Sequence, residues 1–254
     1  MPPRDVHVHL VPKFAEAERL RGSIAIAIDV LRATTTIVHA LAAGCLSVRP
    51  CAEIDEATLL ARSFPASNAL LAGERGGIPI AGFDLGNSPR DCTPARLYDK
   101  TLIMTTSNGT RAILAAAAAD RVLIASFVNF SAVCEQLLSD TRPINIVCAG
   151  DNGEPCLEDT MLAGAFVEVL SEKTNIRPND SARLAWDCFE NHGQILLGAL
   201  EVSSGGERLK EIGCAADLPI AVEVDKFTLV PELRRDPLRI EVAAAGIVKR
   251  HWPR

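Results

Sequence analysis

Apolar runs of strand length alternate with helical patterns between residues 23 and 170. The strand-like runs occupy residues 23–30, 46–50, 69–74, 102–106, 121–126 and 144–150. The helical patterns occupy residues 34–44, 53–64, 109–119, 129–139 and 157–170. Such alternation is typical of parallel strands joined by right-handed crossover helices that cover both faces of the sheet. The sequence therefore predicts an α/β fold with three layers, α/β/α, around a mostly parallel sheet.

The last third of the chain departs from this alternation. Residues 181–213 have a largely helical pattern, and residues 219–233 have the pattern of a late strand or strand pair. No low-complexity linker or internal repeat interrupts the chain. We therefore expect a single domain over residues 1–254, with a possible second lobe from about residue 175.

The composition supports this fold class and limits the partners. Apolar residues make up 48% of the 254 residues but aromatic residues only 4%, which suits parallel strands covered by helices. The net charge of −6 argues against nucleic-acid binding. No apolar run approaches the roughly 18 residues of a membrane span, so we expect no membrane partner. The eight cysteines are scattered without a paired motif, so we expect reduced thiols and a cytoplasmic location. A homodimer is a further possible expectation.

Four polar loops follow predicted strands. The first contains Asp29, Arg32, Thr34 and Thr35; the second Glu74, Arg75, Gly76, Gly77, Asp84 and Asn87; the third Ser107, Asn108, Gly109, Thr110 and Arg111; and the fourth Asp151, Asn152, Glu158 and Asp159. Ligands of open parallel sheets bind outside the carboxyl ends of the strands. All four loops are therefore expected at one edge of the sheet, where they would form a single site.

The residue types in these loops indicate an anion site with a metal ion. Each residue alone has an ordinary role as a turn residue, helix cap or surface charge. Together, Arg32, Arg75 and Arg111 are candidates to bind phosphate, carboxylate or sulfonate groups. The threonines, glycines, Asn87, Ser107 and Asn108 of these loops are candidate substrate contacts.

The carboxylates in the same loops would repel an anion unless a cation lay between them. The simplest such cation is Mg²⁺, with Glu158, Asp159, Asp29 and Glu74 as candidate ligands. Glu158 and Asp159 are neighbours on a predicted helix, and their side chains diverge by about 100°. We therefore expect one to bind the ion and the other to hold a metal-bound water or a neighbouring arginine. Asp29 has three open roles: metal ligand, nucleophile or general base.

The stretch "TTSNGTRA" (105–112) has two interpretations. It is either a plain strand-to-helix turn, or one wall of an oxyanion cradle made by N–H and hydroxyl groups at a helix start. Its place beside the other three loops favours the cradle. The chain has no GxSxG, no P-loop, no intact GxGxxG and no CX5R phosphatase motif.

Four long segments identify a family resemblance. "IDVLRATTTIVHAL", "GERGGIPIAGFDLGNSP", "TTSNGTRAI" and "CAGDNGEPCLEDTMLAGA" resemble, in order and spacing, the 2-phosphosulfolactate phosphatases, the ComB family. The resemblance implies a Mg²⁺-dependent hydrolase that converts 2-phospho-3-sulfolactate to 3-sulfolactate and phosphate, a step toward coenzyme M. One departure is Gly205, which stands where the family often has a histidine. Two alternatives stay open: a phosphatase for another phosphorylated 2-hydroxy acid, and a non-catalytic anion-binding protein.

Overall fold

The fold is a single large sheet with helices on both faces. The computed structural model describes residues 2–65, 67–243 and 249–253. The strands are β1 (Arg4–His9), β2 (Ile24–Ile28), β3 (Ser47–Pro50), β4 (Ala69–Arg75), β5 (Ile78–Pro79), β6 (Thr101–Thr105), β7 (Arg121–Ala125), β8 (Ile144–Cys148), β9 (Ile176–Pro178), β10 (Pro231–Arg234) and β11 (Arg239–Val242). The sheet is 11-stranded, in the order β5-β4-β6-β3-β11-β10-β7-β2-β8-β1-β9.

Eleven α-helices connect or cover these strands in the described part of the chain. They are α1 (Ala17–Leu20), α2 (Ala33–Ala42), α3 (Ile54–Ala61), α4 (Pro94–Leu97), α5 (Gly109–Ala116), α6 (Phe130–Ser139), α7 (Leu157–Lys173), α8 (Asp180–His192), α9 (Leu196–Val202), α10 (Ser204–Glu211) and α11 (Leu218–Ala221). Short 3₁₀ turns occur as well, among them Pro89–Asp91 and Ala215–Asp217. No helix in this part of the chain has the length and apolar character needed to span a bilayer.

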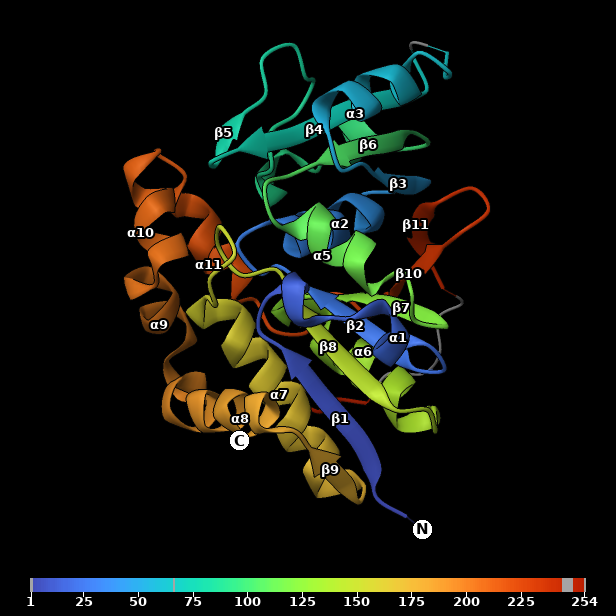
Figure 1. The fold of residues 1–254 in the computed structure, drawn as a ribbon. Helices are drawn as coiled ribbons and strands as arrows, with labels where there is room; N and C mark the ends of the chain where they lie inside the picture. The colour runs from blue at the N-terminus through green and yellow to red at the C-terminus, as the bar shows by residue number, and fades with distance from the viewer. Residues whose placement is uncertain (1, 66, 244–248, 254) are drawn as a thin grey trace.

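The central strand β2 shows why the fold has three layers. Side chains alternate across a strand, so its successive residues face opposite sides of the sheet. Ile24, Ile26 and Ile28 pack into one apolar core, which includes residues of α6 and α7. Ala25 and Ala27 pack into the other, which includes residues of α2 and α5. The predicted α/β/α arrangement with a mostly parallel sheet is therefore confirmed (Figure 1).

The sequence expectation was wrong for most of residues 219–233. Pro219 stands near the start of the short helix α11, a position that favours proline. Asp225 then has a positive φ of 59°, and its carboxylate accepts hydrogen bonds from the N–H and hydroxyl of Ser131. A strand begins only at Pro231. The apolar residues before it fill the core without pairing in the sheet, which explains their strand-like pattern.

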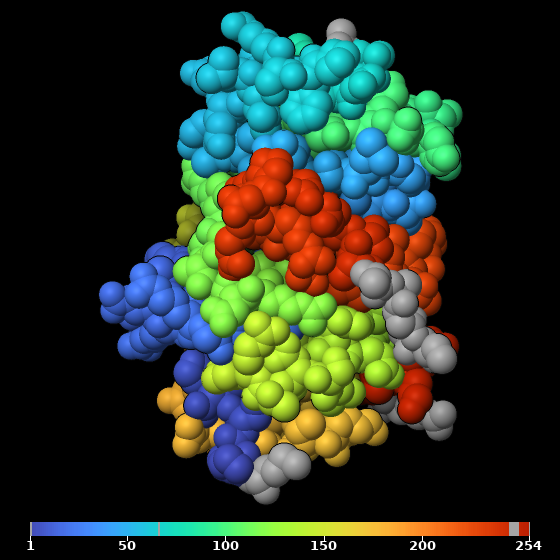
Figure 2. All heavy atoms as spheres, turned by 90° about the vertical axis from the view of Figure 1, so that its right-hand side faces the viewer, coloured from blue at the N-terminus to red at the C-terminus, as the bar shows by residue number. Residues whose placement is uncertain are grey.

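The hairpin of β10 and β11 enters the middle of the sheet. β10 lies antiparallel to β7, and β11 lies antiparallel to β3. Figure 2 shows the C-terminal segment, coloured red, running across one side of the molecule between the cyan and green segments. Among the described strands, every antiparallel pair therefore involves this hairpin or β5 at the sheet edge.

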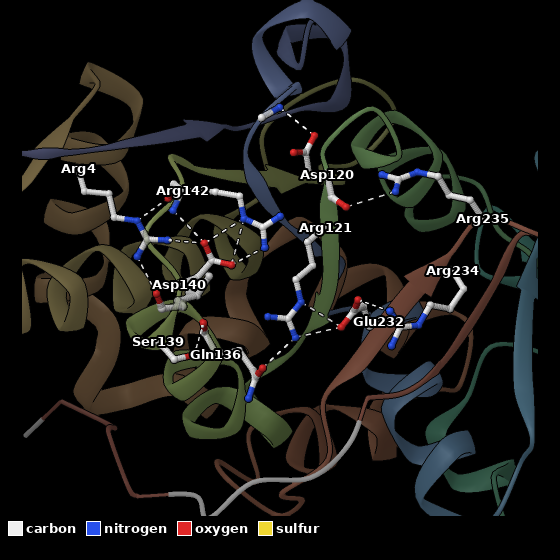
Figure 3. A network of polar contacts seen from close by, with 12 residues as sticks. Arg4, Asp120, Arg121, Gln136, Ser139, Asp140, Arg142, Glu232, Arg234 and Arg235 are labelled. Carbon is white, nitrogen blue, oxygen red and sulfur yellow. Dashed lines mark hydrogen bonds and ion pairs between the residues drawn. The ribbon is translucent and has the colours of Figure 1, made fainter.

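Ion pairs fasten the hairpin to its neighbours (Figure 3). Arg121 of β7 donates to Glu232 of β10 at 3.0 Å and to Gln136 of α6 at 2.8 Å. Glu232 also accepts from Arg234, so two guanidinium groups share one largely buried carboxylate. These contacts join the middle of the chain to its end, away from the carboxyl ends of the parallel strands.

Candidate active site

A cavity lies at the carboxyl ends of β2, β4, β6 and β8, where the four predicted loops meet. It is lined by Asp29, Leu31, Arg32, Glu74, Gly76, Gly77, Asn87, Ser107, Asn108, Gly150, Asp151, Asn152, Cys156, Glu158, Asp159, Gly205, Arg208 and Leu209. Each of the four loops contributes to this lining. The parallel sheet therefore brings together segments that lie far apart in the sequence, as the strand-end rule predicts.

Asp29 occupies the loop between β2 and α2 and is only 7% exposed. Its Oδ1 accepts the backbone N–H of Ala33 at 3.0 Å, which fixes the carboxylate at the start of α2. Its Oδ2 lies beside Gly109, where an added Cβ would be 2.4 Å from the oxygen. Gly109 is thus required because the backbone of α5 comes close to the carboxylate, and Asp29 itself belongs to the cavity lining.

Glu158 and Asp159 begin α7 side by side but have different surroundings. Asp159 Oδ1 accepts the N–H of Val30 at 2.8 Å, and its Oδ2 accepts the N–H groups of Ala149 and Gly150, each at 3.0 Å. Glu158 is 3% exposed, and its Oε2 has no hydrogen-bond partner within the described residues. Asp159 therefore ties the loops after β2 and β8 together, whereas Glu158 has an uncommitted oxygen.

Burial makes the ionisation of these carboxylates unfavourable. Burial raises the pKa of Asp29 to about 7. The charges of Glu74 and Glu158 also raise this pKa, whereas the hydrogen bond from the Ala33 N–H lowers it. Burial also raises the pKa of Glu158 and of Asp159. A nearby cation would favour the ionised forms of all of these groups.

Glu74 occupies the place that the sequence analysis assigned to an external anion. Its Oε1 accepts the Ser107 N–H at 2.7 Å, and its Oε2 accepts the Gly77 N–H at 2.6 Å and the Ser107 hydroxyl at 3.2 Å. The "TTSNGTRA" loop is therefore a cradle, but the anion that it holds is this carboxylate of the protein. Thr110 also uses its N–H and hydroxyl within the loop, in bonds with Thr106.

Arg32 lies in the cavity wall and is 5% exposed. Its Nη1 donates to Asp217 Oδ2 at 2.8 Å, and its Nη2 donates to the carbonyl oxygen of Gly77 at 3.0 Å. Asp217 in turn accepts the Ser88 hydroxyl at 2.7 Å. The guanidinium is thus fixed in place between the β4–β5 turn and the segment before α11.

Several predicted site residues lie outside the cavity lining. Arg75 follows Glu74 on β4 and therefore turns to the opposite side, where it donates to the Thr105 hydroxyl at 2.9 Å. Arg111 is exposed on α5. Thr34 and Thr35 are buried in the first turn of α2 and donate to the carbonyl oxygens of Asp29 and Val30, each at 2.8 Å. Their positions in the structure are those of scaffold or surface residues outside the cavity lining, which argues against the expectation that they contact substrate.

The contribution of α10 to the cavity was not expected from the sequence. Gly205, Arg208 and Leu209 reach the cavity from this helix, which lies about fifty residues after the fourth loop. An added Cβ at Gly205 would lie 2.4 Å from Glu158 Oε1, so the helix backbone packs directly on this carboxylate. The one signal in the sequence was the pair Gly205 and Gly206, which follows the helix cap Ser203. No local pattern connects this pair to a site formed by distant residues.

Sequence comparison gives the cavity a family context. A sequence model of 2-phosphosulpholactate phosphatase matches residues 9–236. A protein of Symbiobacterium thermophilum is 41% identical over 216 residues, which cover 85% of this chain and 93% of the relative. A protein of Caldanaerobacter subterraneus subsp. tengcongensis is 36% identical over 220 residues, 87% of this chain and 91% of the relative.

A third relative, from Synechococcus sp. (strain JA-3-3Ab), is 42% identical over 211 residues, which cover 82% of this chain and 87% of the relative. All three relatives are described as probable 2-phosphosulfolactate phosphatases. The matched region includes every loop that lines the cavity, as well as α10. The chain belongs to the 2-phosphosulfolactate phosphatase family.

Proposed function

We propose that this protein is a Mg²⁺-dependent phosphomonoester hydrolase that converts 2-phospho-3-sulfolactate to 3-sulfolactate and inorganic phosphate. The substrate comes from the relatives' names, and the observation that carries the chemistry is the carboxylate pair of Asp29 and Glu158. Both are buried, both have a raised pKa, and each has one oxygen outside the hydrogen bonds that fix the loops. A role of this reaction in coenzyme M biosynthesis is part of the proposal, and its support is the family resemblance alone.

Asp29 is the residue placed to act on the phosphoryl group. The Ala33 N–H holds Oδ1, so the carboxylate keeps a fixed orientation within the cavity lining, with Oδ2 next to Gly109. In this orientation Asp29 serves either as the nucleophile toward phosphorus or as the base that removes a proton from an attacking water. Both roles need an ionised carboxylate close to the phosphoryl group.

Asp29 and Glu158 fit a Mg²⁺ ion. Buried carboxylates near each other are costly to ionise without a cation, and the partnerless Oε2 of Glu158 is a free oxygen ligand. Among the described residues, no cluster of three His, Cys, Asp or Glu side chains could hold a metal alone. Mg²⁺ often binds through one or two carboxylates and completes its shell with water and substrate phosphate. When bound, it would supply positive charge to the phosphoryl oxygens.

Asp159 and Glu74 have a supporting role in this proposal. Both oxygens of each carboxylate already accept backbone N–H groups from the loops around the cavity. These bonds fix the positions of the loops that carry Asp29, Gly77 and Ser107. Arg32, which Asp217 holds in place, adds a cation to the same wall and stabilises negative charge on the phosphoryl group.

The proposal is tested by phosphate release from purified protein with and without Mg²⁺. The panel contains 2-phospho-3-sulfolactate and 2-phospholactate, a phosphorylated 2-hydroxy acid without a sulfonate. We expect Mg²⁺-dependent release, with the higher kcat/KM on 2-phospho-3-sulfolactate. Binding of both compounds without any release of phosphate would instead support a non-catalytic anion-binding protein. Rapid quenching with labelled substrate then separates the two roles of Asp29, since only the nucleophile forms a phosphorylated protein.

A further inference from the structure

Arg208 lines the cavity and lies near two of its loops. Its Cδ would lie 3.9 Å from a Cβ added at Gly77, so the aliphatic part of the side chain passes over the β4–β5 turn. Its Nη2 lies 3.3 Å from Asp151 Oδ2, on the loop that follows β8. The side chain therefore lies close to two of the loops that line the cavity, the β4–β5 turn and the loop after β8.

Arg208 has fewer of its N–H donors in hydrogen bonds with the protein than Arg32 has. These two arginines are the cations among the described residues that line the cavity. Arg32 is 5% exposed and donates two short hydrogen bonds to protein acceptors. The Arg208 side chain is 40% exposed, and within the described part of the chain its one polar contact is at 3.3 Å, to Asp151, which is itself partly exposed. Since a guanidinium has five N–H donors, Arg208 retains several for a ligand.

The remaining charges of the lining are negative. Asp29, Glu74, Asp151, Glu158 and Asp159 all line the cavity. A substrate that carries a second or third acidic group would be repelled by this wall unless a cation received that group. Asp151 holds Arg208 at the cavity, and a sulfonate or carboxylate would offer the same kind of oxygen acceptor in better geometry.

We propose that Arg208 is a specificity-determining residue, which binds the acidic group that the substrate carries besides its phosphoryl group. This inference rests on the proposed phosphatase function and adds to it the basis of substrate choice. Asp151 acts as a placeholder that keeps the guanidinium at the cavity until the acidic group replaces it. Hydrolysis of the phosphoryl group itself does not require Arg208.

The test compares Arg208→Met with Lys210→Met, which removes a cation from the same helix outside the cavity. Three substrates differ only in their acidic groups: 2-phospho-3-sulfolactate has two, 2-phospholactate has only the carboxylate, and isopropyl phosphate has neither. A charged hydrogen bond contributes about 10- to 100-fold. We expect Arg208→Met to lower kcat/KM by that factor on 2-phospho-3-sulfolactate, mainly through KM, and to leave isopropyl phosphate within about twofold of the wild-type value.

The result with 2-phospholactate identifies the acidic group. If Arg208→Met also impairs this substrate, Arg208 binds the carboxylate; if it does not, Arg208 binds the sulfonate. Equal losses on all three substrates would overturn the inference, because Arg208 would then act on the phosphoryl group. Unchanged kinetics on all three would overturn it as well. Lys210→Met is expected to match the wild type throughout.

A binding measurement keeps this inference separate from the proposed function. Calorimetry with 3-sulfolactate and with inorganic phosphate measures affinity without any reaction. We expect Arg208→Met to weaken 3-sulfolactate binding by about 10- to 100-fold and to leave phosphate binding unchanged. If the wild type hydrolyses none of the three substrates, the phosphatase proposal fails, and a loss of 3-sulfolactate affinity would still support Arg208 as the anion contact. Equal 3-sulfolactate affinity of wild type and variant would overturn the inference.

Discussion

Substitution of Gly205 by alanine is expected to separate activity from stability. Gly205 is the second residue of α10 and does not adopt the left-handed backbone conformation, so alanine is compatible with its backbone. The new Cβ would lie 2.4 Å from Glu158 Oε1, although such contacts are essentially never shorter than 3.0 Å. The Glu158 carboxylate or the helix therefore has to withdraw by at least about 0.6 Å. This shift acts directly on one of the two proposed Mg²⁺ ligands.

The magnitude follows from this displacement. A misplacement of about 1 Å in a catalytic constellation can cost on the order of 100-fold, and we expect a loss of about that size in kcat/KM for Gly205→Ala. We also expect a higher Mg²⁺ concentration for half-maximal activity. The free energy of unfolding should stay within about 1 kcal/mol of the wild-type value, because alanine favours a helix over glycine and offsets part of the contact.

Two other helical glycines provide matched controls. A Cβ at Gly198 of α9 would have nothing within 4 Å, so Gly198→Ala should leave activity unchanged and raise the free energy of unfolding by up to about 1 kcal/mol. A Cβ at Gly206 would lie 1.8 Å from the carbonyl oxygen of Leu200, so Gly206→Ala should destabilise the fold by about 1–3 kcal/mol. Phosphate release at varied Mg²⁺ and urea unfolding measure the two quantities. A folded Gly205→Ala protein with wild-type kcat/KM and Mg²⁺ dependence would refute the reasoning.

Three further perturbations address other parts of the structure. Glu158→Gln should raise the Mg²⁺ concentration for half-maximal activity at least tenfold. Asp159→Asn should mainly lower the free energy of unfolding, by about 1–3 kcal/mol, because Asp159 accepts backbone N–H groups. Equal Mg²⁺ dependence in both variants would contradict the assignment. Arg32→Lys should lower kcat/KM about 100-fold because lysine lacks the planar fork, while Arg111→Lys on the surface should match the wild type, and equal losses would refute this distinction. Burial lowers the pKa of His39 from 6.5 to about 4, so the folded state resists protonation of this residue. The resulting stability is fully present above pH 6.5, the pKa of the unfolded state, and is lost as the pH falls toward 4. That loss is about 3 kcal/mol, and urea unfolding of His39→Gln should show a correspondingly flatter dependence on pH; parallel pH curves for variant and wild type would contradict it.

The sequence predicted most of the parallel strands, but not β1 or β9, because the relevant signals are local. Each strand from β2 to β8, apart from the two-residue β5, is a short apolar run, and most are followed by a helical pattern within a few residues. The hairpin of β10 and β11 gave no comparable signal. Its strands have four residues each and pair with β7 and β3, which lie more than a hundred residues earlier in the chain. Such pairing depends on tertiary contacts that a local pattern does not contain.

The candidate site was predictable in location but less so in detail. The strand-end rule brought the four loops together, and the divergence of neighbouring helix residues gives Glu158 and Asp159 different surroundings. Their separate roles at a metal ion stay a prediction. The inward direction of single side chains was harder to predict. Glu74 and Arg75 are consecutive on a strand, so only one of them can face the cavity, yet both were expected there. Arg208 was missed because the packing of α10 against Gly77 and Asp151 joins distant parts of the chain.

The most direct test of the central claim is phosphate release from 2-phospho-3-sulfolactate by wild-type protein and by Asp29→Asn at saturating Mg²⁺. Asparagine can still accept the Ala33 N–H, so the variant should remain folded, which a thermal unfolding curve verifies. We expect the wild type to release one phosphate per substrate and the variant to be slower by at least about 1,000-fold, because asparagine can neither attack phosphorus nor accept a proton. Equal rates for the two proteins would contradict the assignment of Asp29, and no release by the wild type would contradict the proposed activity.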